Sequence, residues 1–425
     1  MRHALNVAAL LLAMGAGPLA AQPTPTPTPT PAQVQAWHAL REASPYLPFS
    51  GAASEDAEEF RYESLHSGEF LTSARIARGG PVAALPYALR PEIGAARVQT
   101  RLGAMTVDQF VERFPMDGVL ILHHGRIVYE RYPKMRADDA HLTYSVSKVI
   151  PALLVAELVD LGRVDPRLGI EHYIPRLAHS QWAGVTVQNI LDMASGMQKT
   201  GLEDDAWEDE FWASMMGRLP GSTYDYVAAM QRNPEIPQGT DFEYGTQNSF
   251  VLAWLVETMW KRPFADVVSD RLWTRIGAEH DALVGVSPDG APHPRIAMTL
   301  RDLGRVGLLY TPSWRMVSRT RLVSKAALHR TQFEGRPALL KGIEVDLNER
   351  SFPGSRIDHN GWQWDAVFGD GTMWKSGFGG QGLMVSPQHD LVVAFFGSWP
   401  ATGRPDYNRF QWLARQLVER GYFDR

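Results

Sequence analysis

A serine and a lysine stand one helical turn apart at the head of an apolar stretch of the chain. Ser145 and Lys148 precede residues 149–161, and Gly162 follows them. Residues three apart lie on one face of a helix, so the lysine Nζ can reach the serine Oγ. Pro151 is tolerated only in a first helical turn, which places the helix start near Ser145. The free N–H groups of that turn would also stabilise an oxyanion.

The helix behind this pair is apolar almost all round, which predicts a buried, central helix. Burial should lower the pKa of Lys148, and a deprotonated lysine can act as a general base. No other lysine of the chain has a serine three residues before it. The bare pattern also fits a helix-capping serine beside a solvated lysine, so the interpretation depends on further motifs.

Two later stretches carry the other residue types that acyl transfer needs. Tyr244 lies where a turn gives way to a helical pattern, a position from which a phenol can relay a proton. Gln247 and Asn248 follow it at helical spacing. Residues 375–381 are rich in glycine and lead into a strand, where a substrate can approach the backbone and a strand N–H can bind an oxyanion. Taken singly, these stretches also fit a packing tyrosine and a tight turn.

Composition and missing motifs restrict the function classes. The chain has 425 residues, of which 44% are hydrophobic, and this length can build a large core in one domain or two. Its net charge of −5 gives no basic footprint for nucleic acid, and the lack of cysteine excludes disulfide and thiolate chemistry. Neither the Gly-x-Ser-x-Gly elbow nor the His-Glu-x-x-His zinc motif occurs. His123 and His124 fall in a turn without a third ligand, which favours a solvated turn over a metal pair.

The first residues predict export. Arg2 and His3 precede an apolar segment, and small residues before Gln22 offer a cleavage site, so residues 1–21 are interpreted as a signal peptide. The segment is too short to span a membrane, and we expect no membrane span elsewhere. Residues 22–31 form a Thr-Pro tether, and residues 32–94 an N-terminal extension without assigned chemistry. We expect an exported, periplasmic protein.

The order of the predicted elements indicates an α+β fold. A short helix at 106–114 is followed by a hairpin of residues 118–123 and 126–132 and then by the helix behind Ser145. Helical patterns continue to about residue 310, broken by an acidic, aromatic loop at 203–212. Strand-like segments lie between 362 and 396, and a helix is predicted at 406–419. This order predicts an antiparallel sheet from both chain ends, flanked by helices, within a domain of residues 95–425. A mostly helical subdomain at about 165–310 is inserted in it.

Ser145-x-x-Lys148, Tyr244 and the glycine-rich motif stand in the order found in the serine β-lactamase and penicillin-binding-protein-like superfamily, which the chain resembles. Within that superfamily it is most similar to 6-aminohexanoate-dimer hydrolases and related carboxylesterases. The resemblance covers roughly residue 75 to the C-terminus. Further support comes from residues 117–122, 191–197, 242–244, 299–305 and 377–381.

The resemblance implies a β-lactamase-like serine hydrolase that uses no metal or cofactor. Ser145 would attack a carbonyl and form an acyl-enzyme, while Lys148 and Tyr244 would share the proton transfers. The backbone N–H groups of Ser145 and Gln381 would form the oxyanion hole. The substrate, a small ester or amide, would contact Asn248, Trp374, Lys375, Phe378, Gly379 and Gly380.

Two departures from the family pattern bear on the substrate. Related β-lactamases carry Tyr-x-Asn, whereas this chain has Thr246 at that position and its asparagine only at 248. Their third motif opens with a cationic residue that holds a substrate carboxylate, and alignment on residues 379–381 puts Phe378 there. Residues 375–377, Lys-Ser-Gly, offer a second register three residues earlier. Both registers stay open, and Phe378 favours a neutral ester or a linear amide.

Other functions of the same fold remain as alternatives. One is β-lactamase or peptidase-like activity, and another is a ligand-binding or sensor protein that acylates without turnover. The acidic residues at 203–210 also suggest attraction of an amine-bearing substrate, with a solvated charged loop as the other interpretation. The oligomeric state does not follow from the sequence.

Overall fold

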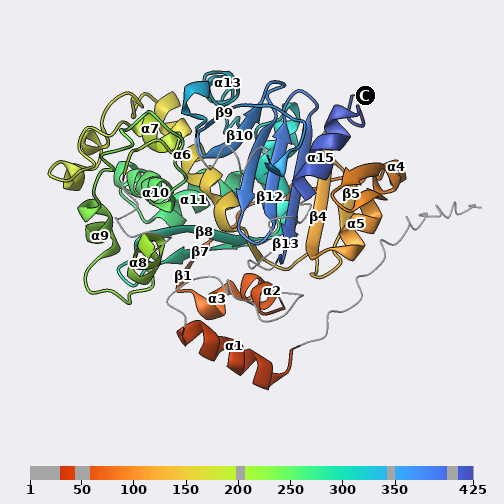
Figure 1. Ribbon diagram of the computed structural model, residues 1–425, viewed down its shortest axis with the longest axis horizontal. Helices are drawn as coiled ribbons and strands as arrows, with labels where there is room; N and C mark the ends of the chain where they lie inside the picture. Colours follow the sequence, from red (N-terminus) through yellow and green to blue (C-terminus); the bar gives the residue numbers. More distant parts are fainter. Residues whose placement is uncertain (1–28, 44–57, 198–205, 342–349, 400–409, 425) are drawn as a thin grey trace, which may run out of the picture.

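The computed structural model describes residues 29–43, 58–197, 206–341, 350–399 and 410–424 (Figure 1). The predicted signal peptide at 1–21 lies outside the described residues, as do residues 22–28 of the tether. The same holds for residues 203–205 of the acidic segment and for residues 406–409 of the last predicted helix.

Among the described residues, seven antiparallel strands form the central sheet, in the order β5-β4-β13-β12-β11-β10-β9. Strand β13, near the C-terminus, pairs with β4 from the first half of the chain, with Val393 opposite Ile121. The sheet therefore joins both ends of the chain, which confirms the predicted α+β arrangement. The strands are β4 (Met116–His123), β5 (Arg126–Arg131), β9 (Ile357–Gly361), β10 (Trp364–Phe368), β11 (Met373–Gly377), β12 (Gln381–Ser386) and β13 (Leu391–Gly397).

The turn of the predicted β4–β5 hairpin has the two-residue form expected from its sequence. His124 and Gly125 both have positive φ values, 52° and 68°, which this kind of turn requires. The His124 Nδ1 lies 3.1 Å from a carboxylate oxygen of Asp390. His124 is thus part of a surface turn, as predicted. The same prediction was wrong for His123, which is buried at the end of β4 because the last residue of an inner strand faces the core.

A second sheet has the strand order β1-β7-β8-β6 (Figure 1). Its strands are β1 (Ser73–Ile76), β6 (His141–Leu142), β7 (Ala282–Val286) and β8 (Pro292–Met298). The prediction of helical structure up to about residue 310 was wrong at β7 and β8, because a short apolar run has no period that separates strand from helix. Strand β1 brings residues of the N-terminal segment into this sheet, and β2 (Arg97–Thr100) and β3 (Gly103–Thr106) form a separate hairpin.

Helices cover both faces of the central sheet (Figure 1). On one face, α5 and α15 pack over a core that contains Phe110, Trp374 and Phe410. On the other face, α6, α10 and α12 pack over Leu120 and neighbouring side chains. The helices of this part of the fold include α4 (Pro91–Ala95), α5 (Val107–Arg113), α6 (Val149–Asp160), α7 (Val187–Leu191), α9 (Thr223–Ala229), α10 (Thr246–Trp260), α11 (Phe264–Arg271), α12 (Leu300–Leu308), α13 (Lys325–Phe333) and α15 (Phe410–Glu419).

The helix predicted behind Ser145 is α6. Ser145 itself lies in a short 3₁₀ turn, η1 (Tyr144–Lys148), which continues directly into α6. Gly162, with φ +67°, lies just beyond the end of the helix, as its sequence position predicts. Helix α5 likewise begins at its predicted cap, because the Thr106 side chain and Gln109 form a reciprocal capping box.

The acidic segment predicted as a loop at 203–212 is helical from residue 206 onward, in α8 (Ala206–Met215). Phe211 and Trp212 are both buried, and Phe211 packs edge-on against Phe250 of α10. Two adjacent large apolar side chains thus hold this segment against the protein, which the acidic composition alone does not predict.

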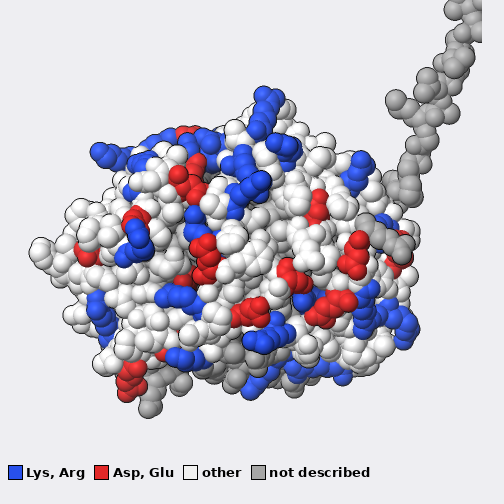
Figure 2. Space-filling view, turned by 90° about the horizontal axis from the view of Figure 1, so that it is seen from above, with Lys and Arg blue, Asp and Glu red and all other residues white. Residues whose placement is uncertain are grey.

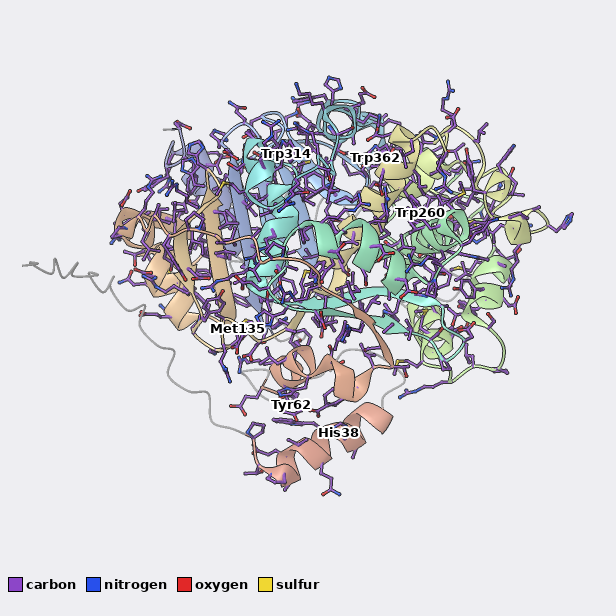
Figure 3. All side chains as sticks on the ribbon, turned by 180° about the vertical axis from the view of Figure 1, so that it is seen from behind. His38, Tyr62, Met135, Trp260, Trp314 and Trp362 are labelled. Carbon is purple, nitrogen blue, oxygen red and sulfur yellow. The ribbon has the colours of Figure 1, made fainter. Side chains whose placement is uncertain are left out.

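Helices α1 (Pro31–Ala43), α2 (Glu58–Leu65) and α3 (Ser67–Phe70) lie together below the two sheets (Figures 1 and 3). The ring of Tyr62 lies 5.1 Å from that of Trp37, and His38 stacks on Phe70 at 4.5 Å. Figure 3 shows His38 and Tyr62 in the layer between α1 and α2. Aromatic contacts therefore join α1 to α2 and α3.

A buried ion pair joins α2 to the central sheet. The Arg61 Nε donates to Asp117 Oδ1 at 2.7 Å. The other carboxylate oxygen, Oδ2, lies 3.2 Å from His141 Nε2 and accepts a hydrogen bond from the Ser398 hydroxyl. Burial opposes ionisation of Asp117, but the His141 hydrogen bond and the nearby positive charges hold its pKa below the usual value. Segments far apart in the sequence thus meet at one carboxylate.

No described helix is both long and apolar enough to cross a bilayer. Acidic and basic side chains are interspersed over the face shown in Figure 2.

Candidate active site

The chain turns sharply just before Ser145. Tyr144 has φ +48°, a left-handed conformation that is uncommon for a residue with a bulky side chain. Its ring is buried and stacks on Phe60 of α2, with 5.3 Å between centroids and 14° between planes. This packing holds the turn that delivers Ser145, partly exposed, to the first turn of a helix.

Lys148 is buried at 3% exposure, with its Nζ directed at two hydroxyls. Its Nζ lies 3.3 Å from Ser145 Oγ and 3.4 Å from Thr246 Oγ1. The predicted nucleophile and base are therefore within hydrogen-bond reach of each other.

Tyr244 lies in the loop that leads into α10, one residue before the N-cap Gly245. Its ring centroid is 5.5 Å from the Nζ of Lys148 and 4.7 Å from the Nζ of Lys375. Two ammonium groups thus flank one tyrosine ring at the distance of cation–π contacts. The structure brings Ser145, Lys148, Tyr244 and Lys375 together in one site.

Asn248 does not take the place that the sequence analysis gave it. The side chain is buried, and its Nδ2 donates to the carbonyl of Gly245 at 3.3 Å, which closes the first turn of α10. Thr246, two residues after Tyr244, contacts Lys148 instead. The signal for Thr246 was present in the sequence, because it occupies the asparagine position of the family's Tyr-x-Asn pattern.

Strand β11 presents residues 375–377 to the site, which favours the earlier of the two registers. Lys375 is fully buried and directed toward Tyr244, and Gly377 packs so closely that a Cβ there would lie 2.7 Å from the Thr143 carbonyl oxygen. The end of β11 therefore lies against the backbone that leads into Ser145. Residues 378–380 form the turn between β11 and β12.

Asp365 of β10 is a further residue of this site that the sequence analysis missed. Its Oδ1 accepts from Lys375 Nζ at 2.5 Å, and its Oδ2 accepts from the N–H and hydroxyl of Ser376 at 2.8 and 2.6 Å. An aspartate inside a strand-like apolar segment has no local pattern that marks it as a partner of Lys375.

Trp374 was predicted to contact the substrate, and the structure contradicts this. Successive residues of a strand point to opposite faces, so Trp374 and Lys375 cannot both face the site. The indole is buried on the other face, stacked on Phe395 at 5.8 Å and edge-on to Phe352 at 5.6 Å.

Gly379 and Gly380 were predicted to contact the substrate. Each instead packs against an aromatic side chain of the protein. A Cβ on Gly379 would lie 2.1 Å from the Phe60 ring, and one on Gly380 would lie 2.1 Å from the Trp399 ring. Both glycines also have positive φ, +75° and +98°. Phe378, 41% exposed, has its ring 5.8 Å from Phe60.

Gln381 is also displaced from its predicted role as an oxyanion donor. It begins β12, an inner strand, and pairs with Gly377 of β11, so its N–H lies within the sheet. Its side-chain amide instead fastens the turn, donating to the carbonyls of Phe378 at 3.0 Å and Gly397 at 2.9 Å. Strand N–H groups alternate in direction, and that of Ser376 faces β10, where it donates to Asp365. The next N–H on this side belongs to Phe378.

Comparison with known proteins agrees with this architecture. The sequence model of the Beta-lactamase family matches residues 104–416. The 6-aminohexanoate-dimer hydrolase of Paenarthrobacter ureafaciens is 28% identical over 365 residues, which cover 81% of this chain and 87% of that relative.

Solved structures show the same fold. A protein described as a putative 6-aminohexanoate-dimer hydrolase from Bacillus anthracis superposes with a TM-score of 0.69 at 22% identity, covering 86% of this chain and 93% of its own. EstCE1, described as a hydrolase with promiscuous acyltransferase activity, has a TM-score of 0.54 at 14% identity, covering 72% and 94%. These likenesses confirm the β-lactamase-like fold and the resemblance on which it was predicted.

Proposed function

This chain belongs to the Beta-lactamase family and is a hydrolase of that fold, and we propose that it cleaves a small ester or a linear amide through an acyl-enzyme on Ser145. The observation that carries the proposal is the 3.3 Å contact between Lys148 Nζ and Ser145 Oγ at the start of a helix. The relatives named as a dimer hydrolase and as a hydrolase with acyltransferase activity support the reaction class.

Acylation begins with proton transfer from the Ser145 hydroxyl to the free amine of Lys148 as Oγ attacks the substrate carbonyl. The developing oxyanion accepts hydrogen bonds from the backbone N–H of Ser145 and, in place of Gln381, from that of Phe378. Each such donor is worth about 2.7–4 kcal/mol of transition-state stabilisation. The carbonyl carbon then reforms its double bond as the leaving group departs.

Tyr244 supplies the proton that the departing alkoxide or amine needs, and Lys148 reprotonates the phenol. Deacylation repeats these steps with water as the nucleophile, which releases the acid and restores the Ser145 hydroxyl. The ammonium groups beside the Tyr244 ring, at 5.5 and 4.7 Å from its centroid, stabilise negative charge on the phenol oxygen during the transfer.

The experiment that tests this proposal is intact mass spectrometry after treatment with a fluorophosphonate. The wild type should gain one adduct and Ser145→Ala none, while Ser147→Ala, which alters a buried serine of the same turn, should still gain one. Hydrolysis of 4-nitrophenyl butyrate should follow the same pattern. A folded wild type that gains no adduct contradicts the proposal. An adduct with an ester burst but no turnover would instead support the sensor function.

A further inference from the structure

The carboxylate of Asp365 is surrounded by donors that converge from β11. The Lys375 ammonium donates to Oδ1 at 2.5 Å, and the Ser376 N–H and hydroxyl donate to Oδ2 at 2.8 and 2.6 Å. Asp365 is 3% exposed and Lys375 fully buried. An ammonium, a hydroxyl and a backbone N–H around two oxygens form a complete receptor for a carboxylate.

This receptor lies where a neighbouring strand leaves the edge of β11. Strands β10 and β11 pair only at Ala366 with Trp374 and at Val367 with Met373. Beyond these two pairs, the N–H of Ser376 donates to the side chain of Asp365 and not to a backbone carbonyl of β10. The edge of β11 that leads to the oxyanion turn is therefore closed by a side chain, which a single substitution can remove.

The receptor also lies beside the groups that serve the leaving group in the proposed reaction. The Lys375 Nζ is 4.7 Å from the ring centroid of Tyr244, and Ser376 is partly exposed. A carboxylate carried by the leaving group of a substrate would therefore come close to these donors. In this chain they already hold a carboxylate of the protein.

We propose that Asp365 acts as a built-in substitute for a substrate carboxylate, so that the site selects esters and amides whose leaving group is neutral. The inference rests on the proposed function. The ammonium of Lys375 is balanced by Asp365, and a second carboxylate brought to the same donors is repelled by the first. A purely structural ion pair would leave the charge of the substrate without effect.

The first test compares two esters that differ by one carboxylate, 4-nitrophenyl butyrate and 3-carboxy-4-nitrophenyl butyrate. Each kcat/KM is divided by the rate of hydroxide-catalysed hydrolysis, which corrects for the leaving groups. The wild type should prefer the neutral ester by about tenfold or more, and Asp365→Asn should reduce this preference by about tenfold. Asp302→Asn alters another buried aspartate, paired with Arg305 on α12, and should keep the wild-type ratio. Equal use of both esters by the wild type overturns the inference, even if Asp365→Asn fails to fold.

The second test needs no catalysis and therefore separates this inference from the proposed function. Asp365→Ala leaves the donors of Lys375 and Ser376 open, so sodium acetate should raise its Tm above that in sodium chloride of equal ionic strength. The wild type should show no such difference, and neither should the double variant Asp365→Ala, Lys375→Met, which lacks the ammonium. Identical melting of Asp365→Ala in both salts would falsify the inference. Absence of Ser145-dependent hydrolysis, with the acetate effect present, would refute only the reaction.

Discussion

Thr246 supplies the second hydroxyl that the Lys148 Nζ contacts. The Nζ lies 3.3 Å from Ser145 Oγ and 3.4 Å from Thr246 Oγ1, so the threonine fixes the lysine beside the nucleophile. A lysine side chain has four rotatable bonds and loses rotamer freedom when it is held in one conformation. The hydroxyl therefore aligns the base before the substrate arrives.

We expect Thr246→Val to lower kcat about tenfold while KM changes little, because the variant keeps the shape of the side chain and removes one hydrogen bond to an amine. Thr246→Ser keeps the hydroxyl and should retain most of the activity. The measurement is steady-state hydrolysis of 4-nitrophenyl butyrate by both variants, with Tm recorded to confirm folding. A valine variant as active as the serine variant would show that Lys148 needs no second partner.

At the scale of elements, a single carboxylate joins three helices. Glu257 on α10 accepts a hydrogen bond from Tyr224 of α9 at 2.6 Å and another from the N–H of Phe264, which begins α11, at 2.8 Å. Burial raises the pKa of Glu257 to about 7, although these hydrogen bonds oppose the shift. The helix junction therefore carries a carboxyl group that titrates near neutral pH.

This raised pKa predicts the direction in which stability changes with pH. Between about pH 4.5 and 7 the folded state holds a proton on Glu257 that the unfolded state has lost, so stability falls as pH rises through this window. We expect Glu257→Gln to remove roughly 1–3 kcal/mol of that fall. The measurement is the free energy of unfolding in urea at several pH values across the window. Glu235→Gln, at an exposed glutamate, controls for the loss of one negative charge. An unchanged slope in Glu257→Gln would contradict the prediction.

At the scale of the whole molecule, the sequence predicted those features that depend on residues close together in the chain. The spacing of Ser145 and Lys148, the cap at Thr106 and the apolar strands of the sheet each follow from residues that are close in the chain. The partners of Tyr144 and Lys375 do not, because Phe60 and Asp365 reach them only through the tertiary fold. For the same reason α2, which lies in the extension of residues 32–94 predicted without chemistry, turns out to support the site.

Helix α2 supports the site from below through one aromatic side chain. Phe60 stacks on Tyr144 at 5.3 Å, packs near Phe378 at 5.8 Å and fills the space beside Gly379. It thus touches both segments that carry the proposed oxyanion donors, the one that ends at Ser145 and the one that begins at Phe378. The neighbouring Arg61 fastens the helix to Asp117 of β4. Geometry at the two donors therefore depends on a helix that precedes both sheets in the chain.

We expect Phe60→Ala to lower both stability and kcat, because it removes the ring that holds these two segments in register. Truncation of a buried phenylalanine typically costs about 3–5 kcal/mol of stability. Phe110→Ala, in the core on the far face of the sheet, supplies the matched control for stability alone. At a temperature where both variants are folded, Phe60→Ala should show kcat at least about tenfold below that of Phe110→Ala, since a misplaced oxyanion donor loses much of its effect. Equal kcat values in two equally destabilised variants would mean that α2 only adds packing, whereas a lower value for Phe60→Ala alone would make α2 part of the catalytic apparatus.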